Sequence, residues 1–312
     1  MKYAIFSDVH GNAHALKLAL EDARREGAEG FLFAGDYCIS MPWANEALAL
    51  IRSVPNAHII RGNDENHLAV PSGDDGQFEV ARWCARALTP ENRAWLDALP
   101  HTLSLTLVGV PVHMAHSSEA FVSKALHARF RTSRLPFYYP DGPVPRDVLA
   151  ADFRSFAATG ELAAAIAALE PGVYIFGHNH IQTWGDFGGR ILINPGSVGL
   201  PLDCGEPGAA YSLMTIENGA VTVEERRVPY DLECLIGKIR GSSQHASARV
   251  WTELIISELC TRREKVAQFL WCCEDYAHSI GDARRPFAKD TWQAALDEWE
   301  RTARDRFPAL FV

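Results

Sequence analysis

Five short motifs in the first 180 residues carry side chains that bind divalent metal ions. They are Asp8-Val9-His10, Gly35-Asp36, Gly62-Asn63-Asp64, the single His116, and Gly177-His178-Asn179-His180. Carboxylate, imidazole and amide oxygen ligands suit manganese, iron or zinc. Each motif follows a short apolar run that is typical of a buried strand. The sequence therefore predicts that separate strand ends bring seven ligands to one edge of a sheet: Asp8, His10, Asp36, Asn63, His116, His178 and His180.

The spacing within the motifs favours a site for two ions. Asp8 and His10 are one residue apart, so both can point into one cleft if the backbone turns, and His178 and His180 could serve one ion each. Asp36 is our candidate for a carboxylate that bridges both ions. Two ions about 3.5–4 Å apart polarise a phosphoryl oxygen and lower the pKa of a bridging water. We therefore expect in-line attack of a metal-bridging hydroxide on phosphorus, without a nucleophilic side chain.

Taken singly, these residues also have structural interpretations. Asp8 could be a helix cap, Asn63 could be a turn residue, and His116 could be an ordinary hydrogen-bonded histidine. The five motifs together, in this order and each at a predicted strand end, favour the metal site.

The elements expected to position the motifs alternate between strands and helices. The apolar patterns predict strands at 3–7, 30–34, 57–61, 102–108, 110–114, 173–176, 182–187, 190–193, 210–216 and 221–228. Helices are predicted at 13–24, 43–52, 78–87, 90–99 and 146–169. The turn Asn218-Gly219 indicates that the last two strands form a hairpin. This alternation predicts an α/β fold in which helices cover a sheet.

The last quarter of the chain differs in character. Residues 231–312 show helical stretches at 249–259, 264–276 and 291–304 without a clear strand pattern, and they contain four of the eight tryptophans. We interpret residues 1–230 as a catalytic domain and residues 231–312 as a helical C-terminal extension. The extension is expected to pack on the core or at a subunit contact, and in the second case it would form a homo-oligomer.

Composition excludes several classes of partner. The chain of 312 residues is 47% hydrophobic and 22% charged, and its formal net charge of -9 argues against binding to duplex nucleic acid. The absence of a signal-like N-terminus and of any apolar run near ~18 residues leads us to expect a cytoplasmic protein that does not bind membranes. The seven cysteines show no framework spacing and are expected to be reduced. Cys38, close to Asp36, is interpreted as a buried filler.

The motifs together resemble the calcineurin-like metallophosphoesterase superfamily, whose pattern is D-x-H, G-D, G-N-[HCx]-[DE], a single H and G-H-x-H. The resemblance covers residues 1–230, and the segment from Asn194 to Gly199 is similar to a loop of the small bacterial phosphodiesterase and phosphatase branch. It implies a four-layer αββα sandwich of two packed mixed β-sheets flanked by helices. It also implies two divalent ions. Manganese is the expected metal, with iron, zinc, nickel or magnesium as alternatives. One ion would be held by Asp8, His10, Asp36 and His180, and the other by Asp36, Asn63, His116 and His178.

Asp64 departs from this resemblance. Many members have a histidine at that position, where it protonates the leaving group or stabilises the transition state. A carboxylate in an ordinary environment cannot donate as a cation at neutral pH. Another residue then supplies the acid, with His67 as one candidate unless it is a surface histidine, or the leaving group needs none. Ala115 also replaces the usual glycine before the single histidine. The predicted catalytic set is Asp36, Asn63, Asp64 and His116.

Candidate substrate contacts lie outside the five motifs. The segment around Arg131, Arg134 and Tyr138 offers phosphate donors and a ring for stacking, so it could cover a nucleotide or be a solvated insertion. The helix that begins near Asn12 could add backbone donors to an anion. Asn12 completes the predicted set of substrate-binding residues.

Three functions fit these residues to different degrees. We expect a metal-dependent phosphoesterase that acts on a small phosphomonoester, a phosphodiester or a nucleotide. The alternative is a non-catalytic binding or scaffold protein that keeps the fold, but such relatives lose ligands, and all seven are present here. A protein phosphatase is less favoured, because its extended signature is missing around Asn63 and Asp64.

Overall fold

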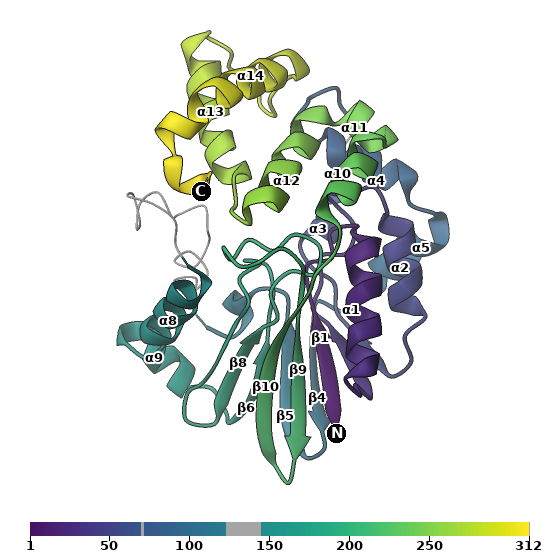
Figure 1. Ribbon diagram of the computed structural model, residues 1–312, viewed down its shortest axis with the longest axis vertical. Coiled ribbons are helices and arrows are strands. Elements are labelled where there is room, and N and C mark those ends of the chain that lie inside the picture. The colour runs from purple at the N-terminus through teal and green to yellow at the C-terminus, as the bar shows by residue number, and fades with distance from the viewer. Residues whose placement is uncertain (70–71, 123–144, 312) are drawn as a thin grey trace.

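Two five-stranded sheets pack face to face and carry helices on their outer sides, as the computed structural model shows (Figure 1). The structure describes residues 1–69, 72–122 and 145–311. The predicted substrate contacts Arg131, Arg134 and Tyr138 lie outside the described residues. The predicted fold class, two packed mixed sheets flanked by helices with a helical C-terminal region, is confirmed.

The first sheet has the strand order β10-β9-β1-β2-β3. Its parallel part consists of β1 (Lys2–Phe6), β2 (Gly30–Phe33) and β3 (Ala57–Ile59). The connections between these strands run through α1 (Ala13–Arg25) and α2 (Ala44–Arg52). The predicted hairpin is formed by β9 (Ala209–Glu217) and β10 (Ala220–Val228), and β9 pairs antiparallel with β1.

The second sheet has the order β4-β5-β6-β8-β7 and is also mixed. Its strands are β4 (Thr102–Leu107), β5 (Val110–Ala115), β6 (Gly172–Ile175), β7 (Thr183–Asp186) and β8 (Arg190–Asn194). β5, β6 and β8 run parallel, whereas the edge strands β4 and β7 are antiparallel to their neighbours. β4 and β5 form an antiparallel hairpin that turns at Val108 and Gly109.

Alternation along β1 explains how the layers separate. Tyr3 and Ile5 belong to the apolar cluster between the two sheets, whereas Ala4 and Phe6 belong to the cluster beneath the outer helices. This division follows from the two-residue period of a strand. The outer helices of this side also include α4 (Glu79–Ala87) and α5 (Pro90–Asp97).

The second sheet is covered by a helix pair where one helix was predicted. Residues 146–169 form α8 (Arg146–Ala157) and α9 (Gly160–Ala167), so the prediction of a continuous helix is wrong. Gly160 has a φ of +58°, a left-handed conformation that interrupts a right-handed helix. Phe153 and Ile166 anchor the pair on the strand residues Tyr174 and Leu192.

The C-terminal residues fold into a helical region that lies above the two sheets in Figure 1. Its helices are α10 (Leu232–Arg240), α11 (Ser243–Ser247), α12 (Arg249–Thr261), α13 (Val266–Ser279) and α14 (Lys289–Arg306). Trp292 and Trp299 are buried with Phe269 in the apolar cluster of this region. A second cluster joins α10 and α12 to Met41, Leu200 and Leu202 of the sheet domain. Oligomerisation through these helices stays a prediction.

Two further expectations can be compared with the described residues. All seven cysteines are free, and Cys38 is fully buried, as its interpretation as a filler requires. Within the ranges that the structure describes, no helix combines the length and the apolar character needed to cross a bilayer.

Candidate metal centre

The ends of five strands bring the motif residues together. Three of these strands run parallel in the first sheet: β1 ends before Asp8 and His10, β2 before Asp36, and β3 before Asn63. Parallel β5 and β6 end before His116 and before His178 and His180 in the second sheet. Three groups of potential ligand atoms each lie within 4.8 Å of one another: Asp8, His10 and His180; Asp36, His116 and His178; and His10, Asp36 and Asp64.

Left-handed backbone conformations direct the ligands inward. Five of the seven predicted ligands have positive φ: Asp8 (54°), His10 (51°), Asp36 (58°), His178 (70°) and His180 (60°). Non-glycine residues seldom adopt this region, and such conformations cluster at functional sites. Because both ends of D-x-H and both ends of H-x-H turn in this way, each motif presents two side chains to the same side. Sequence spacing alone does not reveal this conformation.

The histidines are oriented by backbone carbonyl groups. The Nδ1 atoms of His10, His116 and His180 lie 3.0, 2.7 and 2.7 Å from the carbonyl oxygens of Ile39, Ala34 and Leu200, respectively. A carbonyl can only accept, so Nδ1 carries the proton. Nε2 then has a free lone pair, as in metal-binding histidines.

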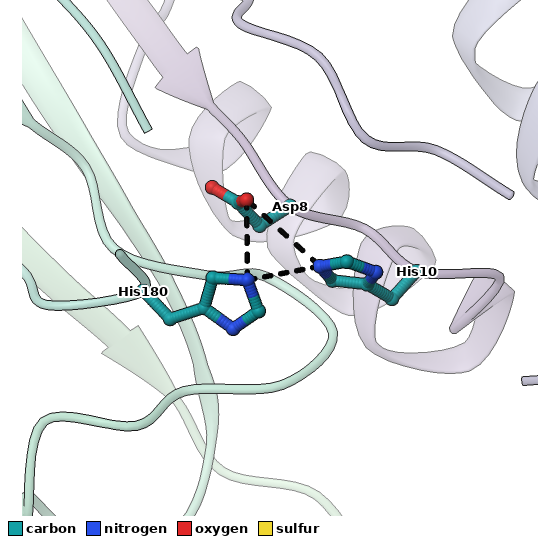
Figure 2. Close-up of side chains that lie close together, drawn as sticks. All are labelled: Asp8, His10 and His180. Atoms are coloured by element: carbon teal, nitrogen blue, oxygen red, sulfur yellow. Dashed lines mark hydrogen bonds and ion pairs between the residues drawn. The ribbon is translucent and has the colours of Figure 1, made fainter. Parts of the chain in front are cut away.

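The Nε2 atoms of His10 and His180 lie 3.0 Å apart, and both face Asp8 (Figure 2). In neutral rings protonated at Nδ1, two lone pairs at this distance repel each other, so either a second proton or a metal cation must lie between them. Distances of 3.8 and 3.3 Å separate these atoms from Asp8 Oδ1. The three side chains therefore fit a shared divalent ion.

Two other ligand atoms lack partners within the part of the chain that the structure describes. Asn63 Oδ1 and His116 Nε2 are buried and form no hydrogen bond there. His116 Nε2 lies 3.0 Å from Asp36 Oδ2, but in the neutral ring protonated at Nδ1 it cannot donate to that carboxylate. Buried polar atoms without partners cost free energy, so these two fit a site completed by metal ions.

The electrostatics of the cluster favour positive charge. Burial lowers the pKa of His10, but Asp64, Asp36 and Asp8 outweigh it and raise this pKa to about 10. Burial is likewise overcome at His116, where Asp36 and Asp8 raise the pKa to about 10. Burial would raise the pKa of Asp8, yet His180, His116 and His10 hold it well below its usual range. Without an ion, His10 and His116 would hold a second proton at Nε2, and a divalent cation would take the place of these protons.

Glu65 connects the loops that carry Asp36 and Asn63. Its buried carboxylate accepts backbone N–H groups from Asp36 at 3.2 Å, Tyr37 at 2.8 Å and Gly62 at 2.8 Å. Burial and the neighbouring Asp36 raise the pKa of Glu65 to about 7, although these N–H donors oppose the rise. No role was predicted for Glu65 from the sequence. Its place two positions after Asn63 was the available signal.

The loop from Asn194 to Gly199 holds two of the motifs in place. Asn194 Nδ2 donates to the carbonyl of Gly177 at 3.0 Å, and Ser197 Oγ donates to the carbonyl of Asp8 at 2.6 Å. Asn12 is also engaged, since Oδ1 accepts from Ala15 N, which caps α1, and Nδ2 donates to Gly199 O, both at 3.1 Å. The side chain of Asn12 thus serves the fold, and its substrate contact stays a prediction.

Asp64 lies beside a predicted ligand. Asp64 Oδ2 is 3.0 Å from His10 Nδ1, and its backbone N–H donates to Asp36 Oδ1 at 2.9 Å. Burial and the nearby Asp36 raise the pKa of Asp64, although His10 opposes this. This geometry orients His10. His67 ends the short helix α3 (Asp64–His67) and is exposed, which matches its interpretation as a surface histidine. A catalytic role for either residue stays a prediction.

A cavity of about 140 Å³ opens over the metal-ligand cluster. The sheet domain contributes His10, Asp36, Asn63, His178 and His180 to its lining. The opposite wall comes from the C-terminal helical region and consists of Trp251, Ile255, Glu258, Glu264 and Val266. None of these five residues was predicted to lie at the site, because helical periodicity shows that a helix has an apolar face but not which part of the protein that face contacts.

Comparisons with known proteins agree with this geometry. Residues 1–219 match the model of the calcineurin-like phosphoesterase superfamily domain. An uncharacterized protein of Methanocaldococcus jannaschii is 25% identical over 240 residues, which cover 76% of this chain and 90% of that protein. The metallophosphoesterase from Sphaerobacter thermophilus has a TM-score of 0.56 at 20% identity, covering 84% of this chain and all of that one. A hypothetical protein from Pyrococcus horikoshii OT3 gives 0.57 at 17% identity, covering 85% and 99%. Both structures share the fold.

Proposed function

Because the chain belongs to the calcineurin-like phosphoesterase superfamily, we propose that it hydrolyses a small phosphorylated substrate at a centre of two divalent ions. The observation that carries this proposal is the pair of histidine Nε2 atoms 3.0 Å apart beside a buried carboxylate. Their Nδ1 protons are committed to backbone carbonyls, so Nε2 is the ring atom left to bind a metal ion.

Seven side chains would hold the two ions. Asp8, His10, Asp36 and His180 would form one set, and Asp36, Asn63, His116 and His178 the other, with Asp36 shared. The carboxylate, imidazole and amide donors of these sets suit manganese, with iron, zinc, nickel or magnesium as alternatives. When bound, two such ions polarise phosphoryl oxygens and lower the pKa of water.

The residues of the chain supply position and selectivity. Carbonyl groups fix the three histidine rings, and Asp64 adds a second partner for His10 Nδ1. The cavity of about 140 Å³ is smaller than the roughly 300 Å³ at the lower end for drug-sized ligands. A compact phosphoester therefore fits this site better than a large one, whether the substrate is a monoester or a diester.

The test is hydrolysis of p-nitrophenyl phosphate and bis-p-nitrophenyl phosphate by metal-stripped protein, before and after manganese is added. We expect two ions per chain and manganese-dependent turnover of at least one substrate. Asp36→Asn should lose more than about a hundredfold in kcat/KM, since it removes the shared carboxylate. The ratio of the two rates distinguishes monoesterase from diesterase activity.

Asp22→Asn is the matched control, because Asp22 is buried but accepts from Tyr211 Oη, away from the candidate metal-ligand groups. This variant should keep both ions and full turnover. Failure of the wild-type protein to bind manganese or any of the alternative divalent ions would overturn the proposal. Binding of two ions without turnover of either substrate would favour the alternative of a non-catalytic binding protein.

A further inference from the structure

An apolar cavity of about 210 Å³ adjoins the metal cavity on the side of Asp64. Asp64, Trp251 and Val266 line both cavities, so the two cavities share these walls. Asp64 also occupies the sequence position directly after the predicted ligand Asn63. The second cavity therefore borders the metal cavity at Asp64.

The walls of this apolar cavity come from two parts of the chain. Val80 and Ala81 on α4 belong to the sheet domain, whereas Leu270 on α13 and Trp251 on α12 belong to the C-terminal helical region. The cavity exists because these two parts meet beside the centre. The C-terminal helices therefore form part of the wall beside the centre.

The size and lining of the cavity indicate the class of group that it accepts. An apolar cavity of roughly 150 Å³ is large enough to bind benzene, and this one is larger. Asp64, His67 and Gln77 are the polar members of its lining, and no lysine or arginine is among the lining residues that the structure describes. A second phosphate group would lack a cationic partner there, whereas an apolar ring would gain contact.

From these observations we infer that the cavity beside Asp64 binds the leaving group of the substrate, and that this leaving group is a compact aromatic alcohol. The inference rests on the proposed phosphoesterase function. Hydrolysis adds water across the P–O bond, so the alcohol leaves with one proton and the phosphoryl group keeps the water oxygen. With the phosphoryl group at the metal centre, the alcohol would extend along Asp64 toward Trp251, Val266 and Leu270.

The experiment compares two ligands that the enzyme cannot hydrolyse. Calorimetry of the manganese-loaded protein gives the Kd of phenylphosphonate and of methylphosphonate, which differ only in the group beside phosphorus. We expect phenylphosphonate to bind at least about tenfold more tightly, because its ring leaves water for an apolar cavity. Leu270→Trp fills the cavity and should remove this preference while leaving the affinity for methylphosphonate unchanged.

Ile280→Trp is the matched control, since Ile280 is 53% exposed just after α13 and does not line the cavity. It should keep the preference for the phenyl compound. Equal affinities of the wild-type protein for both ligands would overturn the inference, even if Leu270→Trp failed to fold. A folded Leu270→Trp variant that still prefers phenylphosphonate would also overturn the inference. The absence of turnover in the earlier assay would instead contradict the proposed function, because binding of phosphonates does not depend on it.

Discussion

Replacing Glu258 by glutamine should stabilise the protein at alkaline pH and not at acidic pH. Glu258 lies on α12 in the wall of the metal cavity and is 1% exposed. Burial, assisted by Glu264, raises the pKa of its carboxyl group to about 7, although the N–H groups of Lys265 and Val266 oppose this at 2.5 and 3.0 Å. Glutamine keeps an amide oxygen for these two donors and removes the charge.

The size of the effect follows from proton binding. The ordinary pKa of Glu258 is 4.5, so between that value and about 7 the folded protein binds more protons than the unfolded chain. Stability therefore falls as pH rises through this window. With about 1.36 kcal/mol for each pKa unit, the loss between pH 5 and pH 8 is roughly 2.5 kcal/mol. Glu258→Gln should gain that amount over wild type between the two pH values.

Urea unfolding in EDTA at pH 5 and pH 8 measures this difference without bound metal. Glu253→Gln on the same helix is the matched control. Glu253 pairs with Arg240 at 2.9 Å, which holds its pKa below the ordinary value despite partial burial. It is therefore ionised in both states across this range, and the control should shift stability equally at both pH values. If the difference in unfolding free energy between Glu258→Gln and the wild type were the same at pH 5 and pH 8, the reasoning would be refuted.

Two further substitutions test how the centre is supported. Asp64→Asn should weaken manganese binding roughly tenfold to a hundredfold, because the carboxylate 3.0 Å from His10 Nδ1 orients that ring; calorimetry measures the change, and the exposed Asp74→Asn should show none. Gly177→Ala should cost about 1–3 kcal/mol and also weaken manganese binding, because its Cβ would overlap Ser7 Oγ and lie 2.5 Å from Asp8 Oδ2. If thermal unfolding showed that Gly177→Ala is as stable as the wild type, the close packing of these loops would be contradicted.

Much of the fold could be predicted from the sequence because strand and helix periods differ. The apolar runs before Asp8, Asp36 and His178 correspond to strands β1, β2 and β6. The helix predicted over 146–169 failed because its alanine-rich composition masked the interruption at Gly160. Local propensity describes each segment by itself, so it locates strand ends better than the breaks within a helical stretch.

Only the metal ligands of the candidate site could be predicted, because their residue types and motifs identify them. Its outer wall is formed by Trp251, Glu258 and Val266, far along the chain from the motifs. Nothing in a helical pattern tells which surface its apolar face will cover, so these residues could not be assigned. The motif marks the position of Glu65 but not its role, because that role depends on three backbone N–H groups whose positions only the fold determines.

The left-handed ligands explain why the motifs depend on one another. Each such conformation costs roughly 1–3 kcal/mol and persists only where neighbouring structure compensates for it. Here the compensation comes from other motifs: Asp8 N donates to Gly35 O and His10 N to Asp36 O, both at 3.0 Å. His178 N donates to the carboxylate of Asp8 at 3.1 Å. Since each strained residue is held by the next motif, a change in one loop must alter the position of ligands in another.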